Sequence, residues 1–160
     1  MKYIPKGWKI ESDVEPSKIK DFDFVSFLKK GEDYIGGTEL QKRAEELNAN
    51  LGMADAEYLL EHQNLIPAEL QDKYLIFAGT VLRDSDGRFR VPCLYWDGGR
   101  WVLSFYWLVS GFSDLGRLAR GKSLDFRTLL KTDKEVLNDI GYRLKVLEEK
   151  FDAVVNALTK

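Results

Sequence analysis

Few side chains in this sequence can carry disulfide or metal chemistry, because its 160 residues include one cysteine and one histidine. A disulfide within the chain needs two cysteines, and a zinc site of the usual Cys/His kind needs several such ligands. We therefore expect no metal and no cofactor. No apolar run approaches the roughly 18 residues of a membrane span, and the start of the chain lacks a signal-peptide core. The expectation is a cytoplasmic protein that binds no membrane.

An excess of one charge is missing as well, since 24 Lys and Arg stand against 26 Asp and Glu, for a net charge of −2. This balance disfavours both a globally basic nucleic-acid binder and an acidic solvating tail. The charge is uneven along the chain, with −5 in residues 1–73, +4 in residues 74–131 and −1 in residues 132–160. The length suits one domain with a sizeable core.

Residues 1–73 are predicted to be mainly helical. Thr38 and Gln41 have the spacing of a capping box, and Leu40, Ala44 and Leu47 follow as one apolar stripe. A second helix is expected over residues 53–62, and Pro67 can open a short third one. Residues 22–28 are apolar with an ambiguous period, which fits either a short helix or a short strand.

Residues 74–131 change to period two. We expect three antiparallel strands over residues 74–82, 89–96 and 101–108, because the segments 84–87 (Asp-Ser-Asp-Gly) and 97–100 (Asp-Gly-Gly-Arg) between them are typical of hairpin turns. Leu75, Val81, Leu94 and Trp101 are expected on one face of this meander. Both faces are largely apolar, so either helices cover both or one face meets a partner.

Residues 132–160 predict a long amphipathic helix, opened by Thr132 with Glu135 in capping-box spacing. Its apolar residues alternate in steps of three and four, as in the a and d positions of a heptad seam. They are Leu137, Ile140, Leu144, Leu147, Phe151, Val154 and Leu158. Arg143 and Glu148 take flanking g and e positions, where a partner helix can pair with them. Leu at a with Ile, Leu and Val at d favours three or four strands over two.

The expected fold class is α+β, with short N-terminal helices packed on a three-stranded antiparallel β-meander and a long C-terminal heptad helix after it. The predicted domains are an α+β domain over residues 1–131 and a C-terminal amphipathic helix over residues 132–160, a candidate coiled coil. Within the first, residues 1–73 form the helical part and residues 74–131 the meander and its connector.

No constellation of catalytic residues emerges. His62 lies near a predicted helix end without a nucleophile motif, and Cys93 lies mid-strand among β-formers, which favours core packing. Residues 84–87 resemble part of a calcium loop, but Leu82 and Cys93 would fall on its outer carboxylate positions, so a turn is favoured. Residues 36–38 (Gly-Gly-Thr) lack the spacing and lysine of a P-loop. We expect no catalytic and no metal-binding residues.

Aromatic and arginine side chains gather in the middle of the chain. Seven of the nine arginines fall within residues 83–127. Aromatic rings beside guanidinium groups can bind single-stranded nucleic acid, sugars or peptides. The candidate ligand-binding residues are Trp96, Trp101, Trp107, Arg90, Arg100, Arg117 and Arg120. The alternative is that the Trp face packs under the helices as core.

A series of short motifs resembles small uncharacterised bacterial proteins that have the same helix-then-meander unit. The resemblance covers about residues 36–108 and rests on Arg43-Ala44, residues 47–52 (Leu-Asn-Ala-Asn-Leu-Gly), 55–57 (Asp-Ala-Glu), 60–63 (Leu-Glu-His-Gln), Ile66-Pro67, Gly79-Thr80, residues 84–87, Val91-Pro92 and residues 96–101 (Trp-Asp-Gly-Gly-Arg-Trp). It implies a recurring unit and carries no activity, ligand or partner with it.

Three functions follow as hypotheses. The first is a non-enzymatic interaction module that self-associates or binds a partner helix through residues 137–158. The alternative is a module that binds single-stranded nucleic acid or another polyanion through the Trp/Arg-rich meander. A small hydrolase ranks last because bases and nucleophiles are scarce.

Overall fold

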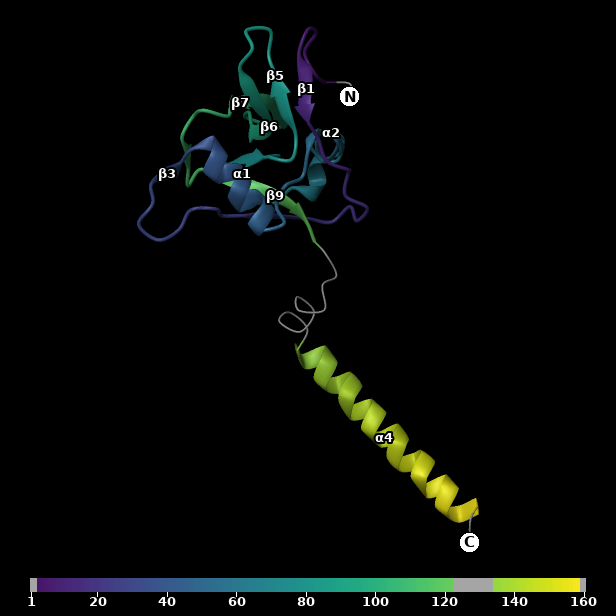
Figure 1. Ribbon diagram of the computed structural model, residues 1–160. Helices are drawn as coiled ribbons and strands as arrows, with labels where there is room; N and C mark the ends of the chain where they lie inside the picture. The colour runs from purple at the N-terminus through teal and green to yellow at the C-terminus, as the bar shows by residue number, and fades with distance from the viewer. Residues whose placement is uncertain (1–2, 123–133, 159–160) are drawn as a thin grey trace. The chain divides into compact units, whose positions relative to one another are not determined.

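The computed structural model describes residues 3–122 and 134–158, with side chains in the C-terminal helix described from residue 141 onward. The chain divides into two compact units, Met1–Lys122 and Ser123–Lys160. We call the first the globular unit and describe each unit by itself (Figure 1).

The globular unit combines a seven-stranded sheet, a two-stranded sheet and two α-helices. Its strands are β1 (Lys9–Ser12), β2 (Phe22–Val25), β3 (Tyr34–Ile35), β4 (Tyr74–Ile76), β5 (Val81–Arg83), β6 (Phe89–Trp96), β7 (Trp101–Trp107), β8 (Phe112–Ser113) and β9 (Gly116–Gly121). Its helices are α1 (Gly37–Glu46), α2 (Met53–Glu61) and the 3-10 turns η1 (Gln63–Leu65) and η2 (Ala68–Leu70). The large sheet runs β1-β5-β6-β4-β9-β2, with β7 also paired to β6, and β3 pairs with β8.

The expected fold class is wrong in its sheet. The large sheet has seven strands and is mixed, because β4 and β9 pair in parallel while the other neighbours are antiparallel. Three of its strands, β1, β2 and β9, lie outside the expected meander. Strand β1 lies in the part expected to be mainly helical, and β2 lies in residues 22–28, where a short helix and a short strand were both open. They form because partner strands supply their hydrogen bonds: β2 pairs with β9 from Phe22↔Gly121 to Val25↔Leu118. Such long-range pairing leaves little local signal in short strands.

Strands β6 and β7 lie where the alternating pattern expects them. They form a hairpin in which Trp96 is opposite Trp101 and Arg90 is opposite Trp107. Gly98 in the connecting turn has a φ of +59°, and Gly87 before β6 has a φ of +80°. These left-handed conformations explain the glycine-rich turn segments.

The expected first strand is split into β4 and β5. Ile76 pairs with Cys93 and Leu82 pairs with Arg90. The chain therefore advances six residues from β4 to β5 while the partner strand β6 advances only three. This irregularity moves Val81 off the predicted face, into the cluster with Ile76 and Val91.

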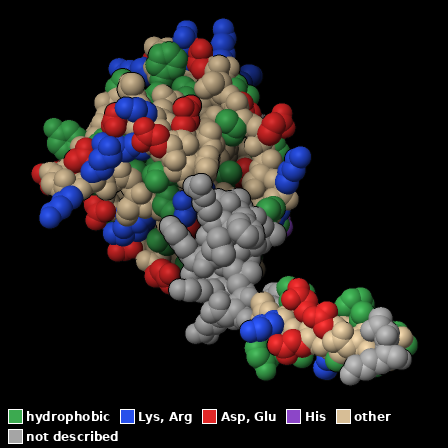
Figure 2. Space-filling model, turned by 60° about the horizontal axis from the view of Figure 1, so that its bottom comes forward, with side chains coloured by type: hydrophobic (Ala, Val, Ile, Leu, Met, Phe, Trp, Pro, Cys, Tyr) green, Lys and Arg blue, Asp and Glu red, His purple; other side chains and the backbone are tan. Residues whose placement is uncertain are grey.

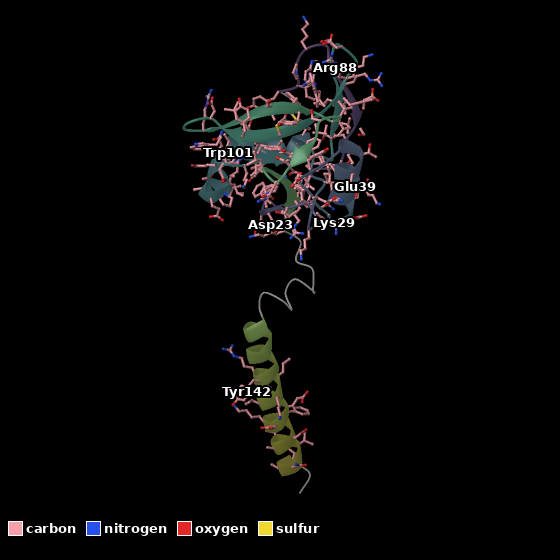
Figure 3. The ribbon with its side chains drawn as sticks, turned by 90° about the vertical axis from the view of Figure 1, so that its left-hand side faces the viewer. Asp23, Lys29, Glu39, Arg88, Trp101 and Tyr142 are labelled. Carbon is pink, nitrogen blue, oxygen red and sulfur yellow. The ribbon has the colours of Figure 1, made fainter. Side chains whose placement is uncertain are left out.

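Helices cover both faces of the sheet. Leu40 and Ala44 of α1 pack in one core cluster with Ile76, Val91 and Leu118. The next residues along β4 and β9 point the other way, into a second cluster. That cluster joins Ala56 and Leu59 of α2 to Leu75, Leu94, Trp101 and Ala119. Figure 3 shows the strands between the two layers, with Glu39 of α1 on one side and Trp101 on the other. Aromatic side chains of β6 and β7 stay partly exposed elsewhere on the sheet, with exposed fractions of 38–41% for Phe89, Tyr95, Tyr106 and Trp107.

The helix starts follow from tertiary contacts as much as from local caps. Helix α1 begins at Gly37, one residue before Thr38, and has no side-chain cap. Gly37 is required there, because a Cβ atom would lie 1.8 Å from the carbonyl oxygen of Leu108. At α2 the hydroxyl of Thr80 accepts a hydrogen bond from the backbone N–H of Met53 at 2.7 Å. The capping box predicted from Thr38 and Gln41 does not form at α1.

The second unit contains α4 (Lys134–Leu158). The expected long heptad helix is wrong: side chains are described for about 18 residues of α4, residues 141–158, and they do not make a long coiled-coil helix. Gly141, a poor helix former, lies within α4. The side chains of Leu137, Ile140 and Glu135 lie outside the described ones, as does Thr132 altogether. Among the residues that the structure describes, no helix is long and apolar enough to cross a membrane.

Candidate functional site

The most exposed apolar surface in the described chain runs along α4. Five predicted seam residues are at the surface, and we call them the α4 stripe. Their exposed fractions are 57% for Leu144, 61% for Leu147, 69% for Phe151, 57% for Val154 and 79% for Leu158. Figure 2 shows hydrophobic side chains at the surface of α4 beside charged ones. Five large apolar side chains on one helix face are typical of a surface that another protein element covers.

Charged side chains border the α4 stripe on both sides. Arg143 and Lys150 come directly before Leu144 and Phe151, and Glu148 comes directly after Leu147. One border is therefore basic and the other holds the acidic residue. These positions correspond to g and e of a heptad, which set partner choice and orientation when helices pair.

The seven candidate ligand-binding residues lie in three separate places. Trp101 is buried, with 2% of its surface exposed, and its ring meets Trp96 edge-on at 5.7 Å in the core cluster next to α2. Arg100 is exposed in the turn between β6 and β7. Trp107 shares the sheet face of Trp101, but six residues at about 3.3 Å each separate them by about 20 Å. Trp101 and Trp107 therefore do not form a single binding site, although they share a face of the sheet.

The two arginines of β9 are held by local partners. Arg117 donates hydrogen bonds to the carbonyl oxygens of Asp114 and Gly116 at 2.6 and 2.7 Å. Arg120 pairs with the Asp23 carboxylate at 2.9 Å. In Figure 3 Asp23 and Arg88 lie at opposite ends of the globular unit, so Arg120 is remote from the arginines near β6.

Arg90 and Trp107 do come together, beside two residues that sequence reasoning missed. The guanidinium carbons of Arg88 and Arg90 each lie 4.9 Å from the Trp107 ring centre, and that of Arg90 lies 5.7 Å from Trp8. We call these four residues the Trp/Arg cluster. Arg90 is fixed by the Asp84 carboxylate at 2.9 Å, whereas Arg88 makes no ion pair within the described residues. Trp8 lies in a Pro/Gly loop far away in sequence, so only tertiary pairing reveals its role.

The two residues weighed as catalytic have structural surroundings. His62 stacks on Tyr58 with ring centres 4.1 Å apart, and its Nδ1 lies 2.8 Å from the Tyr58 carbonyl oxygen. Cys93 is buried in β6, and this burial raises the pKa of its thiol to about 12. Since the thiolate is the reactive form, Cys93 is unsuited to nucleophilic chemistry.

The raised pKa makes Cys93 a reporter of unfolding. We expect its thiol to resist an aromatic disulfide reagent at pH 8 in the native protein and to react fully in denaturant. Absorbance of the released thiolate measures both rates. Fast labelling of the native protein, at a rate independent of denaturant below the unfolding transition, contradicts the buried position.

Sequence reasoning also missed a buried ion-pair cluster around Arg43. Arg43 is 6% exposed and binds both carboxylate oxygens of Glu32, at 2.6 and 2.8 Å. It also pairs with Glu39 at 3.0 Å and donates to the Phe27 carbonyl oxygen at 2.9 Å. The i,i+4 spacing of Glu39 and Arg43 was the available signal. The cluster holds the loop before α1 against the helix. Its buried polar atoms all have hydrogen-bond partners within the described residues, so nothing in it indicates a bound ligand.

This cluster makes stability depend on acid pH. Hydrogen bonds from Arg43 and from the Lys29 N–H lower the pKa of Glu32 from 4.5 to about 2. A carboxylate whose pKa is lower in the folded than in the unfolded state stabilises the fold at pH values above its unfolded pKa. This stabilisation is lost as the pH falls towards the folded-state pKa. We expect Glu32→Gln to be less stable than the parent at pH 7, with the gap closing between pH 4.5 and 2. Denaturant unfolding across this range measures it.

The matched control is Asp33→Asn, since Asp33 is an exposed neighbour without an ion pair in the described structure. Its difference from the parent should stay small at every pH. A Glu32→Gln gap that persists unchanged at pH 2 contradicts the role assigned to the ion pair.

The described residues offer no metal site. No group of three or more His, Cys, Asp or Glu side chains within them is placed to hold a metal ion. Their buried side-chain polar atoms all have hydrogen-bond partners. For example, buried Asp55 accepts from the Ser17 N–H at 2.9 Å and pairs with Lys20 at 3.3 Å. These polar groups hold loops to helices.

Comparisons with family models, curated proteins and solved structures found no match to this chain. The resemblance to small bacterial proteins over residues 36–108 therefore stays a prediction.

Proposed function

We propose that this protein is a non-enzymatic interaction module that self-associates through the α4 stripe. Five apolar side chains at heptad spacing support the proposal, with exposed fractions of 57–79%. Fully burying one such side chain contributes about 1.5–3 kcal/mol.

The observation that carries the proposal is the coverage of the sheet. An amphipathic helix at the end of a chain can also serve to cover its own sheet. Here α1 covers one face with Leu40 and Ala44, and α2 covers the other with Ala56 and Leu59. Both core clusters of the globular unit are thus filled by its own helices, which is why we favour a second copy as the occupant of the stripe.

Truncation tests this proposal. We expect a chain ending at residue 130 to be a folded monomer and the full chain to be an oligomer. Light scattering measures the mass, and circular dichroism with thermal unfolding measures the fold. A truncated chain that unfolds contradicts the proposal, because α4 would then belong to the core of the globular unit.

A second candidate function is polyanion binding at the Trp/Arg cluster. The observation that favours it is Arg88, which stacks on Trp107 and makes no ion pair in the described structure. Its guanidinium donors are thus available to a phosphate or carboxylate. Trp107 is 41% exposed, and Lys9, opposite Arg83 in the sheet, adds positive charge, whereas Arg83 is already paired with Glu11 at 2.7 Å.

Titration with a single-stranded oligonucleotide tests this candidate. We expect a change in Trp fluorescence at low salt that weakens as salt rises, because binding releases counterions. Trp107→Ala should cost about 1–3 kcal/mol of binding. Arg88→Gln should weaken binding, whereas Arg100→Gln, in a distant turn, should not. Unchanged fluorescence at low salt rejects the candidate.

A cytoplasmic location completes the proposal. It is supported by the lone buried thiol of Cys93, which suits a reducing compartment. Partition of the tagged chain between cell fractions tests it.

A further inference from the structure

We infer that neighbouring copies of α4 run parallel to each other, with their α4 stripes in register. This inference rests on the proposed self-association and adds the orientation of the partner. The apolar residues of the stripe can pack against a partner helix that runs in either direction, so they do not select parallel or antiparallel pairing. The charged residues on its borders do.

The two borders of the stripe differ in charge. The g positions are Arg143, Lys150 and Ala157, so this border is basic. The e positions are Gly141, Glu148 and Val155, so the other border carries one acidic residue and no basic one. When helices pair, residues at these positions meet across the seam and select the partner's orientation.

In a parallel pair, the g border of one helix lies against the e border of the other. A g residue then meets the e residue five positions later in the partner. Arg143 of one copy meets Glu148 of the second, and the symmetry of the pair repeats the contact. Lys150 meets Val155, which carries no charge. Parallel pairing thus forms two attractive contacts and no repulsive one.

In an antiparallel pair, g lies against g and e against e. Arg143 and Lys150 then find basic or neutral neighbours, and Glu148 finds a neutral residue or a second Glu148. The antiparallel alignment that keeps Leu144 opposite Val154 places Lys150 beside Lys150 and Glu148 beside Glu148. No antiparallel alignment forms an attractive pair among these positions. Like charges that meet across an interface select against that arrangement.

Disulfide trapping tests the orientation in the full chain. We use Leu158→Cys in a Cys93→Ser background, so that the new thiol is the only one. In a parallel pair the two Cys side chains meet at the same level of the seam. In the antiparallel alignment described above they are 18 residues apart along the axis, about 27 Å at 1.5 Å per residue. A disulfide requires Cα atoms within about 7 Å.

We expect most of the Leu158→Cys protein to become covalent dimer in a glutathione redox buffer. The matched control is Glu149→Cys in the same background, because Glu149 is exposed at the f position, away from the seam. Its covalent dimer should stay a minor fraction. Light scattering of each reduced variant establishes whether it still associates.

Exchange of the charges provides a second test that needs no thiol. Arg143→Glu and Glu148→Arg should each raise the dissociation constant severalfold, and the double variant should restore the parent value. The outcomes separate the two proposals. An oligomer without the Leu158→Cys disulfide and without restoration overturns parallel pairing and leaves self-association intact. A monomeric parent chain overturns both.

Discussion

Phe151→Asp is expected to convert the oligomer into a monomer at tens of micromolar. Phe151 lies in the middle of the α4 stripe, between Leu147 and Val154, so its ring is central to the proposed contact. Losing a buried Phe side chain costs about 3–5 kcal/mol, and a carboxylate without a partner adds a desolvation penalty. A loss of about 3 kcal/mol raises a dissociation constant by more than a hundredfold. Light scattering with size-exclusion chromatography measures the mass.

The chain offers a closely matched control for this substitution. Tyr142 is an aromatic residue of α4 with the same exposed fraction as Phe151, 69%, but it lies at an f position outside the stripe. Tyr142→Asp introduces the same charge in the same helix and should leave the oligomer intact. Equal dissociation by both variants contradicts a specific seam. Leu144→Asp should behave like Phe151→Asp.

Trp101→Ala is expected to lower the free energy of unfolding of the globular unit by about 3–5 kcal/mol, the range for deleting a buried large aromatic side chain. The Trp101 ring is buried against Trp96 in the α2 side of the core. Its backbone is fixed by Gln63, which accepts from the Trp101 N–H at 2.7 Å and donates to the Trp101 carbonyl oxygen at 3.0 Å. Denaturant unfolding followed by circular dichroism measures the change.

Trp107→Ala on the same sheet face is the control for this loss. Its ring is 41% exposed and contacts Arg88 and Arg90 through cation–π interactions of about 0.5–1 kcal/mol each at exposed sites. Its effect should therefore be clearly smaller than that of Trp101→Ala. Equal losses contradict the assignment of Trp101 to the core and of Trp107 to the surface.

The parts of the fold that the sequence predicts are those fixed by neighbouring residues. The β6–β7 hairpin follows from alternating residues and a turn whose Gly98 must adopt a positive φ. Strand β1 has no such signal, because its four residues are all exposed and it forms by pairing with β5. Strand β9 joins β4 in parallel across about forty residues of chain. Such pairing depends on tertiary packing, so a three-stranded meander was predicted where seven strands form.

The candidate site divides in the same way. Spacing along one helix places Leu144, Phe151 and Leu158 on one side, so the α4 stripe is predictable from the sequence. The grouping of the aromatic and arginine residues is not predictable in this way. Two residues on the same face of a strand can still lie far apart along it. Trp101 and Trp107 share a face, yet one is core and the other is surface. Trp8, which completes the Trp/Arg cluster, reaches Arg90 only through the fold.

The mass of the unmodified full chain in solution tests the central claim most directly. Multi-angle light scattering from about 1 to 100 µM should show a mass of at least two copies at the upper end and a decline on dilution. A mass that stays at the 18.4 kDa of one chain over the whole range contradicts self-association through α4.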